Sequence, residues 1–205
     1  MSNSLIKSHL EIAIKSNSHF SQEYYELAKI FLEEKKIKSA IKLLKNAIKS
    51  GLEKSSISEK RGKTLLKKKQ FPQAKKYMFK MGLSKYNTSI YLSELAQIYL
   101  NLSDFKNAEK YALHSLDEYG NQPRAMYILG CIHATNKKWV KAGKLFTESL
   151  GFDYKNARTH LSLARVKQKQ KNTIDAIHHY LIAKDLDQSI SSKSLDKLSE
   201  KHPEL

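Results

Sequence analysis

Small and apolar residues recur along this chain with a constant spacing of 34 residues. Two positions of the repeating unit are always small, and others are mostly apolar or aromatic. The first small series is Ala40, Ala74, Ala108, Ala142 and Ala176, and the second is Ala28, Gly62, Ala96, Gly130 and Ala164. A constant period of this length is typical of repeat architectures, in which each unit buries its apolar face against its neighbours.

Within one period, the apolar positions follow the spacing of an amphipathic helix twice. In the fourth copy, one face consists of Met126, Leu129, Gly130 and His133, and the next of Trp139, Ala142, Phe146 and Ser149. The polar residues 136–138 lie between these faces and predict a turn. With 7 Gly and 3 Pro in 205 residues, the chain has few of the turn residues that β-rich and α/β folds need. The sequence therefore predicts an all-α protein built from helical hairpins.

The 34-residue period, the small residue in the first helix and the alanine in the second resemble the tetratricopeptide repeat. This resemblance implies a right-handed α-solenoid of about five helix-turn-helix repeats. The copies are expected at 21–54, 55–88, 89–122, 123–156 and 157–190, with an N-terminal capping helix in 1–20 and a C-terminal capping helix and tail in 191–205. The family's closing proline is missing from every copy, so we expect other residues to separate the hairpins: Gly51, Gly82, Gly120, Gly151 and Asn156.

The second copy differs from the others in its core positions and in its charge. Arg61 stands where the other copies have leucine, and Ser58 stands where they have a large residue. Arg61 either extends its charged end to solvent along its apolar stem, or it marks a repeat that is pliable or contributes a charge to a site. Residues 55–88 contain ten Lys and Arg against the single Glu59, a net charge of +9 out of +17 for the whole chain. Such a charge attracts acidic partners, or it is only a solvated, lysine-rich surface.

The resemblance implies that a ligand lies on the concave wall, which the first helix of each repeat provides. In copies four and five this wall carries cations and apolar residues without an acid. The predicted partner-binding residues are Arg124, Tyr127, Ile128, Arg158, Leu161, Arg165 and Lys169. Arginine binds carboxylates through paired hydrogen bonds, so we expect an acidic-hydrophobic peptide or helix, although the same positions also suit an ordinary solvated surface. Lys60, Lys63 and Lys67 are expected to form a secondary electrostatic site that steers association.

Patterns that indicate catalysis or metal binding are missing from the sequence. We find no phosphate-binding loop, dinucleotide fingerprint or zinc-ligand spacing. His133 and His160 lie at core-facing positions, and a single cysteine, Cys131, excludes an internal disulfide. The chain shows no signal peptide and no apolar run of membrane-spanning length, so a cytoplasmic location is expected. We therefore expect a protein that is not an enzyme and that binds no cofactor and no metal.

Three functions are compatible with this pattern. The first is a protein–protein interaction scaffold or adaptor that binds a peptide or helix of a partner in the concave groove. The second is an RNA- or ribosome-associated module that uses the basic blocks. The third is a self-assembling scaffold whose grooves accept neighbouring copies. Salt dependence separates the first two, because binding to phosphates weakens steeply as salt rises.

Overall fold

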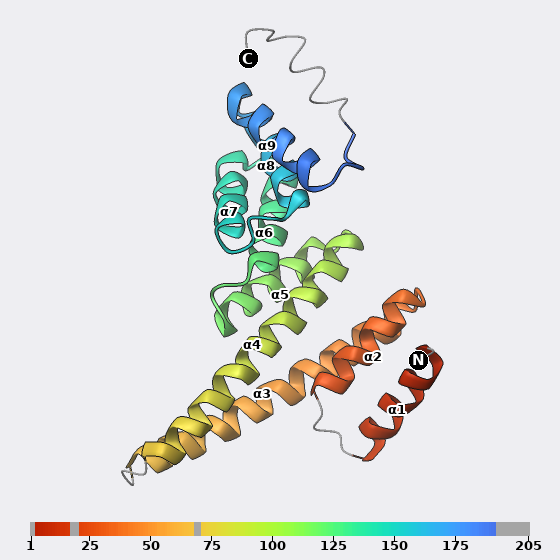
Figure 1. Ribbon diagram of the computed structural model, residues 1–205, viewed down its shortest axis with the longest axis vertical. Helices are drawn as coiled ribbons and strands as arrows, with labels where there is room; N and C mark the ends of the chain where they lie inside the picture. The colour runs from red at the N-terminus through yellow and green to blue at the C-terminus, as the bar shows by residue number, and fades with distance from the viewer. Residues whose placement is uncertain (1–2, 17–20, 68–70, 192–205) are drawn as a thin grey trace.

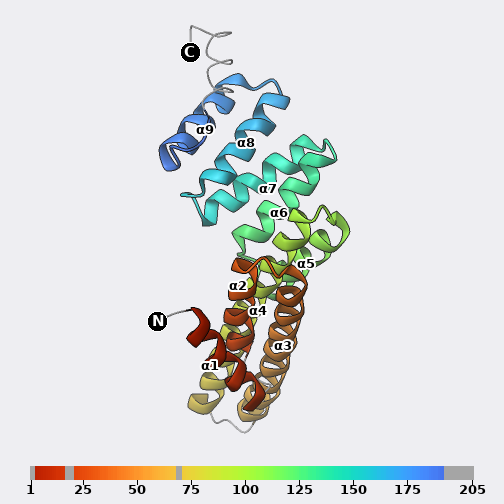
Figure 2. The ribbon, with the colours of Figure 1, turned by 90° about the vertical axis from the view of Figure 1, so that its right-hand side faces the viewer.

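The computed structural model describes residues 3–16, 21–67 and 71–191, and this part of the chain contains helices and no strand. The helices are α1 (Asn3–Ser16), α2 (Ser21–Glu33), α3 (Ile37–Lys67), α4 (Phe71–Asn101), α5 (Phe105–Glu118), α6 (Pro123–Thr135), α7 (Trp139–Phe152), α8 (Ala157–Lys169) and α9 (Thr173–Leu186). They stack in one direction, with α1 to α4 at one end of the molecule and α9 at the other (Figures 1 and 2). The predicted fold class, an all-α helical repeat solenoid, is confirmed.

The turn inside each hairpin has the same conformation in every copy where the structure describes it. Its middle residue has a positive φ, between 57° and 62°, at Lys35, Ser103, Lys137 and Lys171. The next residue donates its backbone N–H to the carbonyl five positions back, at 2.8–3.0 Å. This is the geometry of a helix end closed by a left-handed residue. The turns repeat at intervals of 34 residues, so the period of the sequence is also the period of these helix ends.

The residues of the two small series lie where the helices of a hairpin touch. The members that the structure describes as fully buried are Ala28, Ala40, Ala96, Ala108, Ala142, Ala164 and Ala176. A Cβ atom added to Gly130 would lie 2.6 Å from the Phe146 ring. A larger residue at these positions would therefore force the two helices apart.

Two of the expected breaks between copies do not occur. Helix α3 runs through residues 51–54 and α4 runs through residues 85–88, so two of the expected copy boundaries lie inside helices. The prediction that Gly51 and Gly82 separate hairpins is wrong. Gly51 instead lets α3 and α4 approach each other, because a Cβ atom there would overlap the Thr88 hydroxyl. At the same crossing, Ser84 Oγ donates a hydrogen bond to the Gly51 carbonyl at 2.7 Å.

The junctions that do break contain residues that end or begin a helix. Gly120 lies between α5 and α6, and Pro123 opens α6. Asn156 is the N-cap of α8, since its side chain accepts the N–H of Thr159 at 3.1 Å. Gly151, however, lies in the last turn of α7, so its predicted role as a separator is also wrong.

The two continuous junctions lack such signals. Lys54 stands at the position of Asn156, and an ammonium group has no acceptor with which to cap a helix. Thr88 stands at the same position one copy later, but its hydroxyl donates to the Ser84 carbonyl at 2.8 Å inside α4. Without a cap or a breaker at either junction, nothing local stops the helix from continuing.

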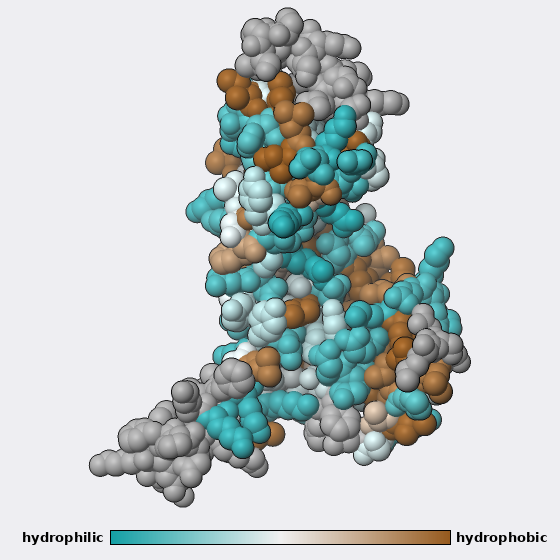
Figure 3. Space-filling model, in the orientation of Figure 1, coloured by the Kyte–Doolittle hydropathy of each residue, from teal (hydrophilic) through white to brown (hydrophobic). Residues whose placement is uncertain are grey.

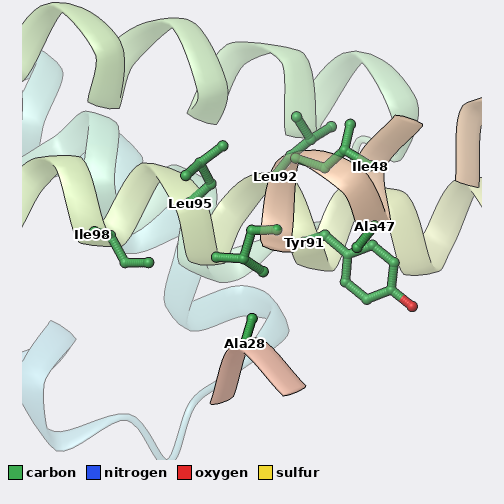
Figure 4. Packing of buried hydrophobic residues seen from close by; sticks show 8 residues of the cluster. Ala28, Ala47, Ile48, Tyr91, Leu92, Leu95 and Ile98 are labelled. Carbon is green, nitrogen blue, oxygen red and sulfur yellow. The ribbon is translucent and has the colours of Figure 1, made fainter. Parts of the chain in front are cut away.

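As a result, the first copy packs directly on the third. One core cluster joins Ala28 of α2 to Leu44, Ala47 and Ile48 of α3 and to Tyr91, Leu92, Leu95 and Ile98 of α4 (Figure 4). In a regular array, the second copy would lie between these residues. Here its helices, residues 55–67 and 71–84, leave the stack as a projecting two-helix arm at the lower left of Figure 1.

The structure describes the expected N-terminal cap of the stack but not the expected C-terminal cap. A helix is present in the expected N-terminal cap, where Lys7 Nζ lies 2.8 Å from Glu34 Oε1 and 4.3 Å from the Phe31 ring centroid. Leu195 and Leu198, which the sequence suggests for a C-terminal cap, lie outside the described residues.

His160 is the buried, hydrogen-bonded histidine that its position predicts. Its Nε2 donates to the Tyr154 carbonyl at 2.9 Å, and its Nδ1 lies 3.1 Å from His179 Nδ1, so one of these two Nδ1 atoms must be unprotonated. Burial lowers the pKa of both imidazoles, that of His179 to about 4. His133 is only half-buried.

Candidate functional site

A groove of about 390 Å³ crosses the first helices of copies one, three, four and five. These helices present to it the face that points away from the hairpin core. Its lining residues are Tyr25, Ile90, Ser93, Glu94, Gln97, Gln122, Pro123, Arg124, Tyr127, Asp153, Asn156 and Arg158. The groove therefore lies on the wall to which the resemblance assigns ligand binding, near the N-terminal ends of α6 and α8.

Two half-buried tyrosines give the groove a rigid aromatic surface. The Tyr127 ring centroid lies 5.7 Å from that of Phe146, and the Tyr25 centroid lies 4.7 Å from that of Tyr91. Tyr91 in turn donates its hydroxyl to Gln22 Oε1 at 2.8 Å. Burial raises the pKa of Tyr91 and of Tyr127 to about 12, so both phenols keep their protons near neutral pH.

The charged groups of the groove are of both signs. Arg124 forms an ion pair with Glu94 of α4, which the sequence assigns to the third copy. The expectation of a wall without a counter-ion is therefore wrong for Arg124, because the helix that approaches from the neighbouring copy supplies the acid. Asp153 accepts a hydrogen bond from Asn156 Nδ2 at 2.9 Å. Within the described residues, Arg158 makes no ion pair, and it is near enough to Tyr127 for its charge to act on the phenol.

Of the seven predicted partner-binding residues, the structure brings Arg124, Tyr127 and Arg158 together in the groove. Ile128 does not lie on the wall: its side chain is 0% exposed and packs among buried alanines such as Ala108 and Ala125. Adjacent helical residues point about 100° apart. With Tyr127 in the groove, the next side chain along α6 is directed into the core.

The other three predicted residues lie farther along α8 and outside the groove lining. Leu161 is half-buried against the cluster of Ala164, Ala176 and Tyr180 that joins α8 to α9. Arg165 and Lys169 are exposed. With a helical rise of 1.5 Å per residue, they stand about 10 and about 16 Å along the axis from Arg158. Four of the seven predicted residues therefore lie outside the lining of this groove.

The predicted secondary electrostatic residues belong to the arm. Lys60 is exposed on the outer half of α3. The side chains of Lys63 and Lys67 lie outside the described residues. Lys60 is not among the residues that line the groove.

The groove also contains residues that the sequence did not single out as a site, above all Tyr25 and Ile90. Both hold wall positions in their own copies, so the repeat register could have identified them as exposed to a ligand. The repeat register could not show, however, that these two residues line the same groove. Tyr25 reaches the third copy only because the second copy has left the stack.

Comparisons by sequence find no relative: no family model matches the chain, and no curated protein matches it. Solved structures do resemble it. PilF of Pseudomonas aeruginosa is 19% identical over 93% of this chain and 86% of its own, with a TM-score of 0.50, and MamA is 12% identical over 89% and 86%, with a TM-score of 0.53. YrrB, described as a TPR protein with an unusual peptide-binding site, is 16% identical over 96% and 98%, with a TM-score of 0.44.

At such identities the likeness concerns the fold. Together with helix ends that repeat every 34 residues, it decides the architecture. The chain has a tetratricopeptide-type fold. Its tetratricopeptide hairpins are regular in copies three to five, and the arm is the departure from the regular stack.

Two further observations concern the part of the tetratricopeptide solenoid that the structure describes, residues 3–16, 21–67 and 71–191. None of its helices combines the length and the apolar composition needed to cross a membrane. No group of three or more His, Cys, Asp or Glu side chains is placed to hold a metal ion.

Proposed function

We propose that this solenoid is a protein-interaction scaffold that holds a peptide segment of a partner in the groove over α4, α6 and α8. One observation carries the proposal. Arg158 makes no ion pair within the described residues, and it lines the same groove as the half-buried ring of Tyr127. Arginine and tyrosine are among the residues that dominate many binding hot spots.

The chemistry of the groove favours a segment with one acidic and one apolar or aromatic side chain. Arg158 can bind a carboxylate through two parallel hydrogen bonds. Tyr127 and Tyr25 offer apolar ring surface at low conformational cost. Neighbouring helices lie about 8–10 Å apart, so an extended segment of roughly six residues spans the distance from α4 to α8.

Peptide selection followed by charge reversal tests the proposal. Peptides from a displayed random library would be selected on the full chain, and their affinity would be measured for Arg158→Glu and for Arg165→Glu. The second variant is a matched control, because Arg165 is an exposed arginine on the same helix outside the groove. We expect Arg158→Glu to weaken binding by at least about 2 kcal/mol, roughly thirtyfold, and Arg165→Glu to change it little.

The selected sequences themselves form a second readout. We expect an acidic residue near an apolar one in most of them. If the peptides lack acids, or if both reversals weaken binding equally, the groove is not the binding site.

A further inference from the structure

The base of the arm carries a second groove, of about 430 Å³. It begins at Ser21, the first residue of α2, and continues between α3 and α4. Its apolar part contains Ile57 of α3 and Leu83 of α4, whose side chains are 53% and 52% exposed. Single exposed apolar residues are common on protein surfaces, but these two come from different helices and line one groove.

The groove lies in line with α2. Helix α2 packs on the α3/α4 pair through Ala28, which belongs to the cluster of Leu44 and Tyr91. Helix α2 begins at Ser21, whereas α3 and α4 continue past it into the arm. Among the described residues, the face that α2 covers on one side of Ser21 continues on the other side as the groove between α3 and α4.

Small and polar residues form the contact between α3 and α4 where the arm begins. Gly51 and Ser55 of α3 are buried there, and Ser84 donates to the Gly51 carbonyl. Such residues add little apolar burial. A helix laid over this contact would contribute apolar contacts with Ile57 and Leu83 that the two arm helices do not make by themselves.

Two lysines line this groove, and the segment that forms the arm is strongly basic in sequence. Lys54 and Lys80 line it, and residues 55–88 carry ten Lys and Arg against one Glu. Figure 3 shows hydrophobic and hydrophilic side chains next to each other at the base of the arm. Electrostatic complementarity therefore favours a partner with acidic residues beside its apolar face. A second copy of this chain would add its own net charge of +17.

We propose that the base of the arm is a docking surface for an acidic amphipathic helix of a partner protein, which lies on α3 and α4 in continuation of α2. Its apolar stripe contacts Ile57 and Leu83, and its carboxylates face Lys54 and Lys80. Docking of an amphipathic helix into an apolar groove is a general mode of recognition. This surface is separate from the groove of Tyr127 and Arg158.

The test uses the full chain and a synthetic helical peptide of about 14 residues, roughly 21 Å long. Leucines form one face of this probe and glutamates the rest. A second peptide has the same composition in scrambled order, without an apolar face, and a single-stranded oligonucleotide of equal charge is a third ligand. Fluorescence anisotropy gives the affinity of each. We expect the amphipathic probe to bind at least about tenfold more tightly than either of the other two.

Matched variants locate the site. Ile57→Ser with Leu83→Ser should weaken binding of the amphipathic probe at least about tenfold, because two apolar contacts are lost. Val140→Ser with Ile174→Ser is the control, since those side chains are 77% and 65% exposed elsewhere on the molecule, and it should leave binding unchanged. A loss of probe affinity in Arg158→Glu, with none in the Ile57→Ser, Leu83→Ser variant, would show that the probe binds the groove of Tyr127 and Arg158 and would overturn this proposal.

Two other results would also overturn the proposal. Equal binding of the scrambled peptide would show a diffuse attraction for acidic chains. Tighter binding of the oligonucleotide, insensitive to Ile57→Ser and Leu83→Ser, would show that the arm binds nucleic acid.

Discussion

Copies three to five and copies one and two share one sequence period but differ in structure. In the first region the helices end at regular intervals, at Asn101, Glu118, Thr135, Phe152, Lys169 and Leu186. Around the second copy, α3 merges helices of copies one and two, and α4 merges helices of copies two and three. The apolar period is present in both regions, so it does not determine where a helix stops. Capping and breaking residues do so, and the second region lacks them at two junctions.

The largest expected effect concerns the direct contact between the first and third copies. Tyr91 is 1% exposed and belongs to the cluster that joins them. We expect Tyr91→Ala to lower the free energy of unfolding by about 3 to 5 kcal/mol, the cost of removing a buried aromatic ring. Tyr119→Ala is the control, because Tyr119 is 40% exposed and should cost far less. Urea denaturation measures both, and similar losses would mean that Tyr91 is not in a core.

The regular region can be disturbed at its hairpin contacts. Ala142 is fully buried between two helices, and Ala142→Leu should cost about 1 to 3 kcal/mol through overpacking. Val140→Leu, on the exposed side of the same helix, should change stability by less than about 0.5 kcal/mol. Denaturant titration of the two variants gives the comparison. A neutral Ala142→Leu would contradict the assignment of the small series to the hairpin contact.

A double-mutant cycle isolates the contact between copies one and three. Tyr91 donates its hydroxyl to Gln22 across 69 residues of sequence. The variants Tyr91→Phe and Gln22→Ala, alone and combined, should show a coupling free energy of about 0.5 to 1.5 kcal/mol. Strict additivity would indicate that the second copy lies between the first and the third, as in a regular array.

The carboxyl-terminal hairpin of the regular region should be sensitive to acid. The folded state lowers the pKa of His160 and His179, that of His179 to about 4, while an unfolded histidine titrates near 6.5. The unfolded chain therefore takes up protons first as pH falls. The free energy by which these lowered pKa values stabilise the folded state is fully present above about pH 6.5. It is lost as pH falls from there through the folded pKa values.

Melting curves recorded over this range check the effect. His179→Gln should flatten the fall of melting temperature relative to the natural chain. His178→Gln should flatten it much less, because the exposed His178 acts on His160 and His179 only through its charge, whereas burial is the largest cause of their lowered pKa values. Asp175 and Lys167 also act on His179 and keep their own ion pair in both variants.

The smallest effect concerns the turns that both regions share. Lys137 has a φ of 57°, a conformation that glycine adopts without strain. Lys137→Gly should therefore raise stability by at most about 1 kcal/mol. Lys141→Gly, within α7, should lower it by about the same amount. Thermal unfolding distinguishes the two, and a loss at both positions would show that the turn is not strained.

The sequence predicts much of this fold because small residues and helical periodicity are local properties. The turn around Lys137 and the buried positions of Ala108 and Ala142 follow directly from the period. The arm does not, since its formation depends on the cap that Lys54 fails to supply and on the approach of Gly51 to Thr88. The unusual residues Ser58 and Arg61 belong to the copy that leaves the stack, but the side chain of Arg61 lies outside the described residues, and neither residue indicated the arm.

The site was predictable only in part for the same reason. Arg124, Tyr127 and Arg158 share positions within their repeats, so the register places them on one wall. Ile128 was misplaced because a neighbouring residue on a helix belongs to a different face. The ion pair of Arg124 with Glu94 joins two copies, and a reading that treats each copy alone does not reveal it.

The extrusion of the second copy also bears on the order in which the chain folds. In the regular region, contacts such as that between Ser89 and Ser115 span 26 residues, whereas the Tyr91–Gln22 contact spans 69. Closing a longer loop costs more entropy, and non-local contacts slow folding. During synthesis from the N-terminus, the first copy has no third copy to pack against until about residue 98 has been made. The amino-terminal end of this solenoid should thus be completed late, although it is made first.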